Sequence, residues 1–188
     1  MKNNRILLNE LITINGVNSY LVNIFLILIG TFILTISAKI QVPFWPVPMT
    51  MQTFVVFLIG MTYSVRLSFL TLLTYLAEGA FGLPVFAAGG GLAYLVGPTA
   101  GYLYGMTLSV ILISYLANKG FTQTYFKITL SLIAGSIIIF LFGILYLGSI
   151  IGYQKAIQAG LLPFIPSEIF KIALAVAIIP TIKNFIKL

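Results

Sequence analysis

The chain has 188 residues, of which 60% are hydrophobic and only 7% are charged, and its mean hydropathy is +1.13. A soluble domain of this size does not need so much apolar sequence, so the composition indicates an integral membrane protein, with residues 1–188 as one domain. The net charge is +7, but the ten basic residues are scattered, whereas a nucleic-acid-binding protein would cluster them. The lipid bilayer is therefore an expected partner, and a nucleic acid is not.

The side chains that most often carry chemistry are missing. Cysteine, histidine and aspartate are absent, and the only carboxylate side chains are Glu10, Glu78 and Glu168. This removes thiolate nucleophiles, imidazole bases and nearly every metal ligand, so we expect no catalytic residue, no metal and no cofactor. There is also no Gly-x-x-x-x-Gly-Lys-Ser/Thr phosphate loop. If the chain takes part in ATP-driven transport, another polypeptide must hydrolyse the ATP.

The chain begins with a short polar segment and continues with six apolar runs. Residues 1–19 are predicted to form a short cytoplasmic amphipathic segment rather than a signal peptide, because no clean cleavage site follows. The predicted helices are 20–38, 50–63, 66–80, 99–117, 128–147 and 167–186, with Thr50 and Ser167 as candidate N-caps. Three prolines between residues 43 and 48 predict an extended loop, and the segment 148–166 is expected to be a mixed loop. The fold class is therefore all-α, with six transmembrane helices.

The basic residues predict the orientation. Seven lie on the same side as the two termini: Lys2, Arg5, Arg66, Lys119, Lys127, Lys183 and Lys187. Three lie on the other side: Lys39, Lys155 and Lys171. Because positive residues are enriched in cytoplasmic loops, both termini are expected in the cytoplasm. The proline loop, a glycine-rich segment at 82–105 and the segment 148–166 then face outward.

The glycine-rich segment is apolar but too broken for a continuous helix. Irregular backbone at membrane depth persists only where protein or a cavity covers it, so we expect this segment to fold over a ligand. Ala87, Gly89, Gly90 and Gly91 either touch the ligand through their backbone or only let the loop close. The glycines 97, 101 and 105 are spaced four apart and form a ridge for helix packing. Gly105 is expected to serve packing, whereas Gly97 and Gly101 serve either packing or close approach to the ligand.

Three further residues are candidates for the same site. Gln52 is a neutral donor and acceptor in an apolar helix, so we expect it to face the protein interior and the ligand. Tyr102 either offers its hydroxyl to the ligand or lies in the interfacial belt of tyrosines. Trp45, the only tryptophan, is either a lid over the ligand or an anchor at the membrane surface.

Glu168 and Lys171 are three residues apart, so they share one face of the last predicted helix. Ionisable groups near membrane depth are costly and usually functional. Glu168 can accept hydrogen bonds from ligand N–H groups, and Lys171 can donate to a ligand oxygen. The alternative is a local ion pair, with Glu168 at the first helical position complementing the helix dipole. Glu78 is expected either to pair with Lys39 or to face the glycine-rich loop.

Four motifs carry a family resemblance. They read Val-Pro-Met-Thr-Met-Gln at 47–52, Gly-Leu-Pro-Val-Phe-Ala at 82–87, Gly-Pro-Thr-Ala-Gly-Tyr at 97–102 and Leu-Pro-Phe-Ile-Pro-Ser-Glu-Ile-Phe-Lys at 162–171. In their order and spacing they resemble the BioY family, the biotin-specific substrate-binding components of energy-coupling-factor transporters. The resemblance runs from about residue 25 to the C-terminus. In the last motif, Ser167 stands where the family has glycine, Glu168 stands where it has aspartate, and Lys171 matches.

The resemblance implies a six-helix protein of the bacterial inner membrane that captures biotin on the outer face. It also implies docking on a transmembrane coupling subunit that carries two ATPase subunits. Such components dock through small residues on their first helix, and the corresponding residues here are Gly30, Thr31, Thr35 and Ala38. The low-charge site would suit the ureido ring, apolar thiophane and single carboxylate of biotin, and the sequence leaves open which end meets Lys171.

Three other functions are alternatives to biotin transport. A binding component for another small vitamin would use the same scaffold. A membrane enzyme is disfavoured by the missing histidine, cysteine and aspartate. A structural or assembly subunit would not explain the irregular glycine-rich segment. We therefore expect a biotin-binding membrane protein that delivers its ligand inward and is not an enzyme.

Overall fold

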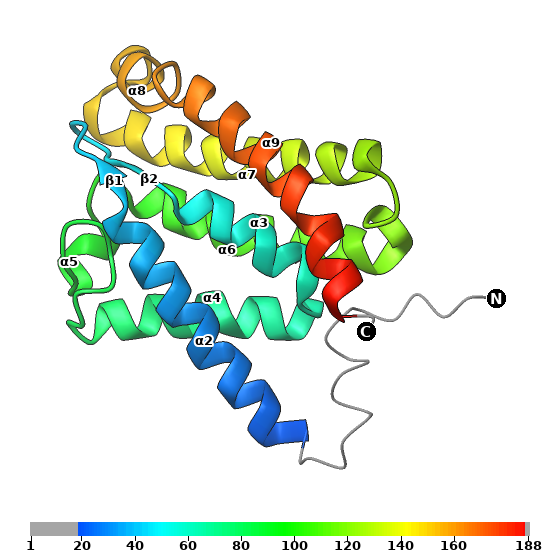
Figure 1. Ribbon diagram of the computed structural model, residues 1–188. Coiled ribbons are helices and arrows are strands. Elements are labelled where there is room, and N and C mark those ends of the chain that lie inside the picture. The colour runs from blue at the N-terminus through cyan, green and yellow to red at the C-terminus, as the bar shows by residue number, and fades with distance from the viewer. Residues whose placement is uncertain (1–18, 187–188) are drawn as a thin grey trace.

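The computed structural model describes residues 19–186 and forms a bundle of helices (Figure 1). The expected amphipathic segment 1–19 lies, apart from Ser19, outside the described residues. The elements, in chain order, are α2 (Ser19–Lys39), β1 (Gln41–Val42), β2 (Met49–Thr50), α3 (Gln52–Thr62), α4 (Val65–Ala80), α5 (Leu92–Leu95), α6 (Ala100–Leu116), η1 (Ala117–Phe121), α7 (Tyr125–Ile151), α8 (Tyr153–Gly160) and α9 (Phe164–Ile186). The prediction of a mainly helical protein is confirmed.

Four of the described helical segments are long and apolar enough to cross a membrane: Tyr20–Lys39, Ala100–Phe121, Tyr125–Ile151 and Phe164–Ile182. The α3 helix has 11 residues, and at about 1.5 Å per residue it is about half as long as a bilayer core is thick. Most of its residues are buried, because it packs against α2, α6 and α9. Its apolar sequence therefore reflects burial inside the bundle.

The irregular segments gather at one end of the bundle. The β1–β2 hairpin, α5 and α8 lie together at the left of Figure 1, and the last turns of α9 lie at the opposite end. In the proline loop, Gln41 pairs with Thr50 and Val42 with Met49 in an antiparallel ladder, so the expected extended loop is a short hairpin. We call this end of the molecule the loop end.

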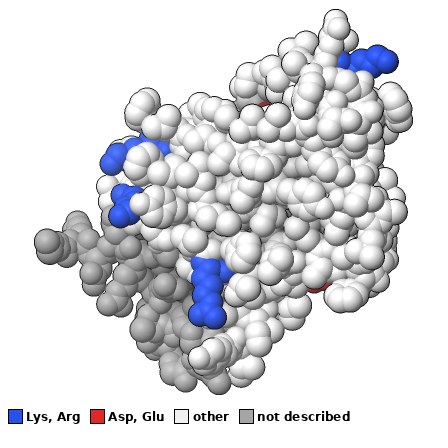
Figure 2. Space-filling model, turned by 180° about the vertical axis from the view of Figure 1, so that it is seen from behind, with Lys and Arg blue, Asp and Glu red and all other residues white. Residues whose placement is uncertain are grey.

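Charged side chains are sparse on the surface, and most of the blue side chains in Figure 2 lie away from α8. Arg66 lies in the first turn of α4, Lys119 lies in η1 and Lys127 lies in the first turn of α7, all at the end opposite the loop end. Lys39 and Lys155 lie at the loop end. Each of these five residues lies at the end that the sequence predicted, and the orientation of the chain in the membrane stays a prediction.

The α6–α7 pair is the most extensive helix contact, and two of the three ridge glycines, Gly101 and Gly105, lie in it, whereas Gly97 lies against residues 93 and 94. A Cβ added at Gly105 would lie 2.9 Å from the Cα of Ile139, which confirms its packing role. A Cβ added at Gly101 would collide with the Tyr146 side chain and would lie 2.5 Å from the carbonyl oxygen of Phe142. Gly101 therefore lies against α7.

The prediction of a mixed loop at 148–166 is wrong. The α7 helix continues to Ile151, Gly152 with its φ of 88° turns the chain, and α8 follows. This short helix buries Ala156 and Gly160 and exposes its polar side chains. The polar composition suggested a loop, but one small-residue face is enough to hold a surface helix against α7.

The α9 helix begins at Phe164, so the prediction that Ser167 caps it is wrong. Pro166 is tolerated there because the N–H groups of the first turn have no intrahelical partner. Glu168 is consequently the fifth residue of the helix and Lys171 the eighth, so neither occupies the first turn. The predicted cap Thr50 does bond to the start of α3, because its hydroxyl accepts a hydrogen bond from the Gln52 backbone N–H at 3.3 Å. The residue that directly precedes α3 is nevertheless Met51.

The small residues of the first helix face the interior of the protein. Gly30, Thr31 and Ala38 are buried, and a Cβ added at Gly30 would lie 2.6 Å from the Thr71 side chain on α4. Three of the four expected docking residues are therefore not on the surface, Thr35 is half-buried, and Gly30 and Thr31 contact the chain's own α4. The exposed face of α2 instead carries large apolar side chains, among them Phe25 and Phe32.

Candidate functional site

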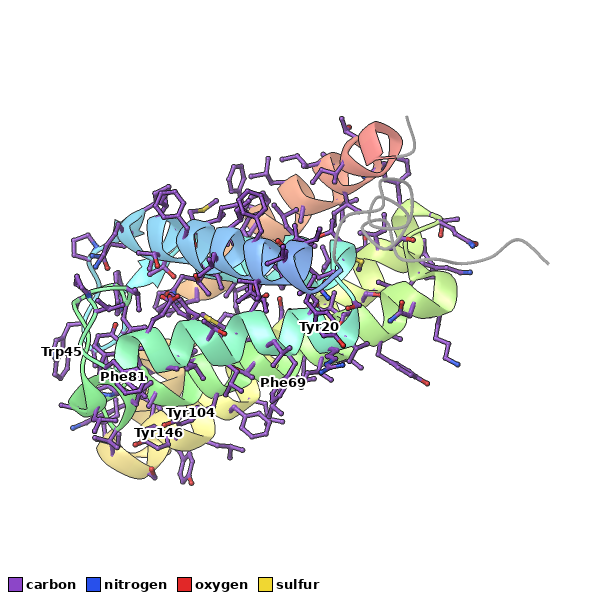
Figure 3. All side chains as sticks on the ribbon, turned by 90° about the horizontal axis from the view of Figure 1, so that it is seen from below. Tyr20, Trp45, Phe69, Phe81, Tyr104 and Tyr146 are labelled. Atoms are coloured by element: carbon purple, nitrogen blue, oxygen red, sulfur yellow. The ribbon has the colours of Figure 1, made fainter. Side chains whose placement is uncertain are left out.

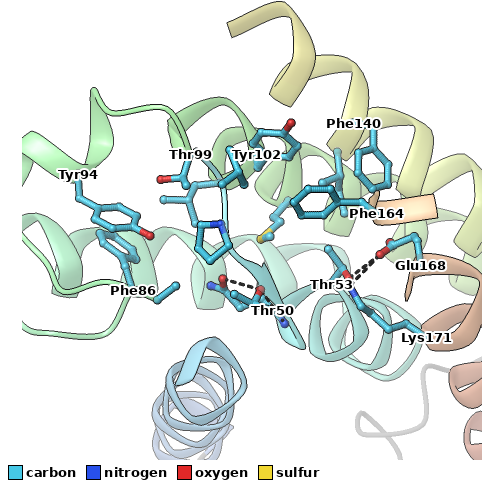
Figure 4. A pocket seen from close by; sticks show the side chains of 17 residues that line it. Thr50, Thr53, Phe86, Tyr94, Thr99, Tyr102, Phe140, Phe164, Glu168 and Lys171 are labelled. Carbon is cyan, nitrogen blue, oxygen red and sulfur yellow. Dashed lines mark hydrogen bonds and ion pairs between the residues drawn. The ribbon is translucent and has the colours of Figure 1, made fainter. Parts of the chain in front are cut away.

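A cleft opens at the loop end between α3, α6, α7 and α9, and residues of the hairpin region and of the glycine-rich segment also line it (Figure 4). Its polar groups concentrate at one side, where Glu168, Lys171 and Thr53 meet. Five aromatic residues line most of the rest: Phe86, Tyr94, Tyr102, Phe140 and Phe164. An apolar cleft with a few convergent polar groups is the usual form of a small-molecule site.

The polar side of the cleft is a compact network across three helices. Lys171 Nζ lies 3.0 Å from Glu168 Oε2 and donates to Thr53 Oγ1, also at 3.0 Å. The Thr53 hydroxyl donates to Glu168 Oε2 at 2.9 Å. The Ser136 hydroxyl, from α7, donates to Glu168 Oε1 at 2.9 Å. Glu168 and Lys171 are each only 4% exposed, so this is a buried ion pair whose charges are further stabilised by hydrogen bonds.

The network leaves room for one more donor and one more acceptor. A carboxylate oxygen has two lone pairs, and Thr53 and Lys171 occupy those of Oε2, whereas Ser136 occupies one of Oε1. Lys171 has three N–H bonds, and within the described part of the chain two of them are directed to Thr53 and Glu168. The site can therefore accept one hydrogen bond at Glu168 and donate one from Lys171.

The aromatic residues form two flat surfaces. Tyr102 and Phe164 lie nearly parallel at 20°, with ring centroids 6.4 Å apart, and Phe140 meets Phe164 edge-on. Phe86 stacks on Tyr94 at 4.8 Å near the opposite side of the cleft. Flat apolar walls of this kind fit a ring and a methylene chain by burying them between aromatic faces.

Three consecutive carbonyls hold the glycine-rich segment above the cleft. Val85 O accepts from the Tyr75 hydroxyl at 2.8 Å, and Phe86 O accepts from Lys39 Nζ at 2.6 Å. Ala87 O accepts from the Gln41 amide at 3.2 Å. Side chains from α4, α2 and β1 thus hold residues 85–87 in place beside the cleft, and we call this short segment the roof.

Several predicted site residues line the cleft. Ala87, Gln52, Tyr102, Glu168 and Lys171 all do so. The Gln52 side chain donates to the Tyr75 hydroxyl at 2.7 Å and accepts from Thr50, so it also steadies the roof. The Tyr102 hydroxyl donates to Gly160 O at 2.8 Å, which turns the ring rather than the hydroxyl toward the cleft.

The remaining predicted residues lie elsewhere. Among the described residues that line the cleft, Gly89, Gly90, Gly91 and Gly101 are not found. Gly89 bonds back to Phe86, and the Gly91 amide donates to Gly79 O at 2.7 Å, so these glycines close the loop. Gly89 and Gly91 have φ values of 131° and 100°, which favour glycine. Their contact with a ligand stays a prediction.

Trp45 lies at the loop end and is 83% exposed (Figure 3). Its exposure fits an anchor at the membrane surface, and its role as a lid stays a prediction. Glu78 is not paired with Lys39; it accepts a hydrogen bond from the Thr31 hydroxyl at 3.0 Å, while Lys39 holds the roof.

Sequence reasoning missed Thr53, Ser136, Lys39, Gln41 and Tyr75. The only available signal was the polar atom that each of them places in a largely apolar segment. Such polar atoms usually face a partner inside the protein. Their partners could not be named, because the contacts of Thr53 and Lys39 span 115 and 47 residues.

Long apolar helices, together with a half-open aromatic cleft that ends in a buried ion pair, define a membrane-type protein that binds a small molecule. Residues 9–188 match the BioY family, and the chain belongs to that family.

Two relatives and one solved structure illustrate the similarity. The chain is 36% identical over 178 residues to the probable biotin transporter BioY of Rickettsia prowazekii, covering 94% of this chain and 91% of the relative. It is 37% identical over 158 residues to the biotin transporter BioY of Thermotoga maritima, covering 83% and 92%. Its fold resembles the crystal structure of the S-component for biotin from an ECF-type ABC transporter, with a TM-score of 0.78, 23% identity and coverage of 90% and 95%.

Proposed function

We propose that this protein is the biotin-binding membrane component of a vitamin importer, which captures biotin at the loop end and releases it on the other side of the membrane. The observation that carries the proposal is the free acceptor position of Glu168 beside the free N–H of Lys171, at one end of an aromatic cleft. The names of the relatives in the BioY family support the choice of ligand.

The paired donor and acceptor favour the ureido ring of biotin over its carboxylate. A cyclic urea presents an N–H donor next to a carbonyl acceptor, which complements Glu168 and Lys171 taken together. A ligand carboxylate at Lys171 would instead come close to the Glu168 carboxylate, because the two side chains are 3.0 Å apart, and like charges repel at that distance. The thiophane ring and the chain then lie along the aromatic walls, including Phe164 and Tyr102.

The bundle is expected to cross the bacterial inner membrane six times, with α3 and α4 as the two short spans. Four described segments meet the length and hydropathy needed for spanning, and the sequence assigns seven basic residues to the side of the termini and three to the side of the loop end. This asymmetry supports termini in the cytoplasm and a cleft that opens outward. The lipid bilayer would cover the exposed apolar side chains.

Inward release requires energy from a partner. The sequence has no phosphate loop, so ATP hydrolysis would take place on two ATPase subunits joined through a transmembrane coupling subunit. The α2 helix offers the surface for docking, because its outward face is apolar and includes Phe25 and Phe32. No cofactor is required, since the ligand is moved and not converted.

Equilibrium binding of labelled biotin to the purified protein in detergent tests the ligand, with riboflavin and thiamine measured beside it. We expect saturable binding of biotin alone. Absence of saturable biotin binding refutes the proposal, and saturable binding of another vitamin would favour the alternative ligand on the same scaffold.

Two modified ligands test the pose. Biotin methyl ester should retain most of the affinity, whereas a derivative with a carbamate on a ureido nitrogen should lose it. The reverse order would place the ligand carboxylate at Lys171. Biotin uptake into membranes that lack every coupling subunit would refute the proposed partners and leave the ligand assignment intact.

A further inference from the structure

Ser136 lies outside the cleft and still contacts its central carboxylate. It lines a separate apolar groove between α7 and α9, beside Ile133 and Ile137. Glu168 lines both the groove and the cleft, so it forms part of the wall between them. Ser136 is therefore on the far side of Glu168 from a ligand in the cleft and can act on it only through that carboxylate.

The three donors to Glu168 are not equivalent. Thr53 and Lys171 both donate to Oε2, whereas Ser136 donates to Oε1. A carboxylate held at one oxygen can still turn, because the terminal torsion of glutamate is broad. A bond to the second oxygen removes that freedom. Ser136 is 6% exposed and has a single O–H, which it directs to Glu168.

We propose that Ser136 is a positioning residue of the binding site, which fixes the Glu168 carboxylate so that the free position on Oε1 meets the ligand N–H. The inference rests on the proposed function, because it assumes that biotin is bound through Glu168. A site whose polar groups are fixed before the ligand arrives loses less conformational freedom on binding.

The length of the glutamate side chain makes this contact possible. The hydrogen bond from Ser136 to Oε1 measures 2.9 Å, which is within the normal range. An aspartate at this position would withdraw the carboxylate by about 1.5 Å, the length of one carbon–carbon bond. The Ser136 hydroxyl would then have no partner on α9, so the effect of Ser136 depends on glutamate at 168.

The test measures biotin affinity by equilibrium binding for Ser136→Ala in two backgrounds, the natural protein and the Glu168→Asp variant. We expect Ser136→Ala to weaken binding about tenfold in the natural background, which corresponds to about 1.4 kcal/mol. In the Glu168→Asp background the same change should have less than a twofold effect. Such a difference between backgrounds measures coupling between the two side chains.

Matched variants separate this role from simple packing. The side chains introduced by Ser136→Thr and Ser136→Val have the same shape, but only threonine keeps the hydroxyl, and both place a methyl group beside the apolar groove. The threonine variant should bind biotin with the affinity of the natural protein, and the valine variant with the affinity of Ser136→Ala. Ser131→Ala is the control, because Ser131 is also buried on α7 but bonds to Lys127 O of its own helix. It should leave the affinity unchanged.

Equal affinity of the valine and threonine variants overturns the inference, and so does an equal loss from Ser136→Ala in both backgrounds. A natural protein that does not bind biotin overturns the proposed function and this inference together, and it is recognised in the first titration. Thermal unfolding of each ligand-free variant identifies loss of folding, in which case the threonine–valine comparison still decides.

Discussion

The buried pair of Glu168 and Lys171 allows stability and ligand binding to be separated by mutation. Within the described residues, Lys171 is the only cation bonded to the Glu168 carboxylate, at 3.0 Å, and it is 4% exposed. Lys171→Met keeps an unbranched apolar side chain but removes the ammonium group, which leaves the carboxylate buried without a counter-charge. Removing one partner of such a pair typically costs about 3 kcal/mol or more.

For a chain of this size, about 3 kcal/mol corresponds to a fall in Tm of about 6–12 °C, at about 2–4 °C per kcal/mol. The double variant Glu168→Gln with Lys171→Met removes both charges. The glutamine oxygen can still accept from Ser136, and its NH2 group can donate to the Thr53 hydroxyl oxygen, which no longer accepts from Lys171. Because replacing a whole buried pair by neutral groups is often neutral in energy, the double variant should recover most of the lost Tm. Neither variant should bind biotin.

The assay is thermal unfolding in detergent, followed by biotin titration of the same samples. Lys155→Met is the matched control, because Lys155 lies on the exposed side of α8, and its Tm should not change. If Lys171→Met unfolds at the natural temperature, the argument from a buried pair is wrong. If the double variant binds biotin with natural affinity, the two residues form only a structural ion pair.

Three further predictions concern the glycine ridge, the tryptophan and the roof. Gly101→Ala should lower the Tm by several degrees, at a cost of about 1–3 kcal/mol, because the new Cβ would collide with α7. Gly97→Ala is the control and should leave the Tm unchanged, because the nearest atom to its new Cβ is 3.4 Å away. Equal Tm values for the two variants would contradict the packing role of Gly101. Trp45→Ala should change biotin affinity less than about twofold, given its exposure, and a tenfold loss would indicate a lid. Lys39→Met should speed biotin dissociation about fivefold, since the carbonyl of Phe86 loses its donor; an unchanged rate would show that the roof does not retain the ligand.

The sequence predicted best the helices that are both long and uniformly apolar. The first helix, expected over 20–38, spans Ser19–Lys39, and the fourth, expected over 99–117, spans Ala100–Leu116. The short helix α8 was missed because its polar residues outnumber its buried ones, and a single turn of small residues against α7 stabilises it. The start of α9 was misplaced because prolines in a first turn look the same as prolines in a loop.

In the site, likewise, the sequence predicted contacts between residues close in the chain and missed those between distant segments. The pairing of Glu168 with Lys171 was visible as a spacing of three, because the helix brings such residues onto one face. The bonds from Thr53 and Ser136 join α9 to α3 and α7, and no local pattern encodes them. For Gly89 and Gly91 the sequence left open ligand contact or loop closure, and in this structure their positive φ values serve loop closure.

The sequence by itself determined that this is a helical membrane-type protein with few charges, and that an acid and a lysine lie three residues apart on one helix face. These properties follow from composition and from contacts within a few residues. Only the tertiary structure decided that the small residues of α2 face inward and that Ser136 reaches Glu168. It also decided that Lys39 holds the roof while Glu78 bonds to Thr31. The physical reason is that these contacts depend on which helix faces pack together, and the faces that pack come from segments that are far apart in the sequence.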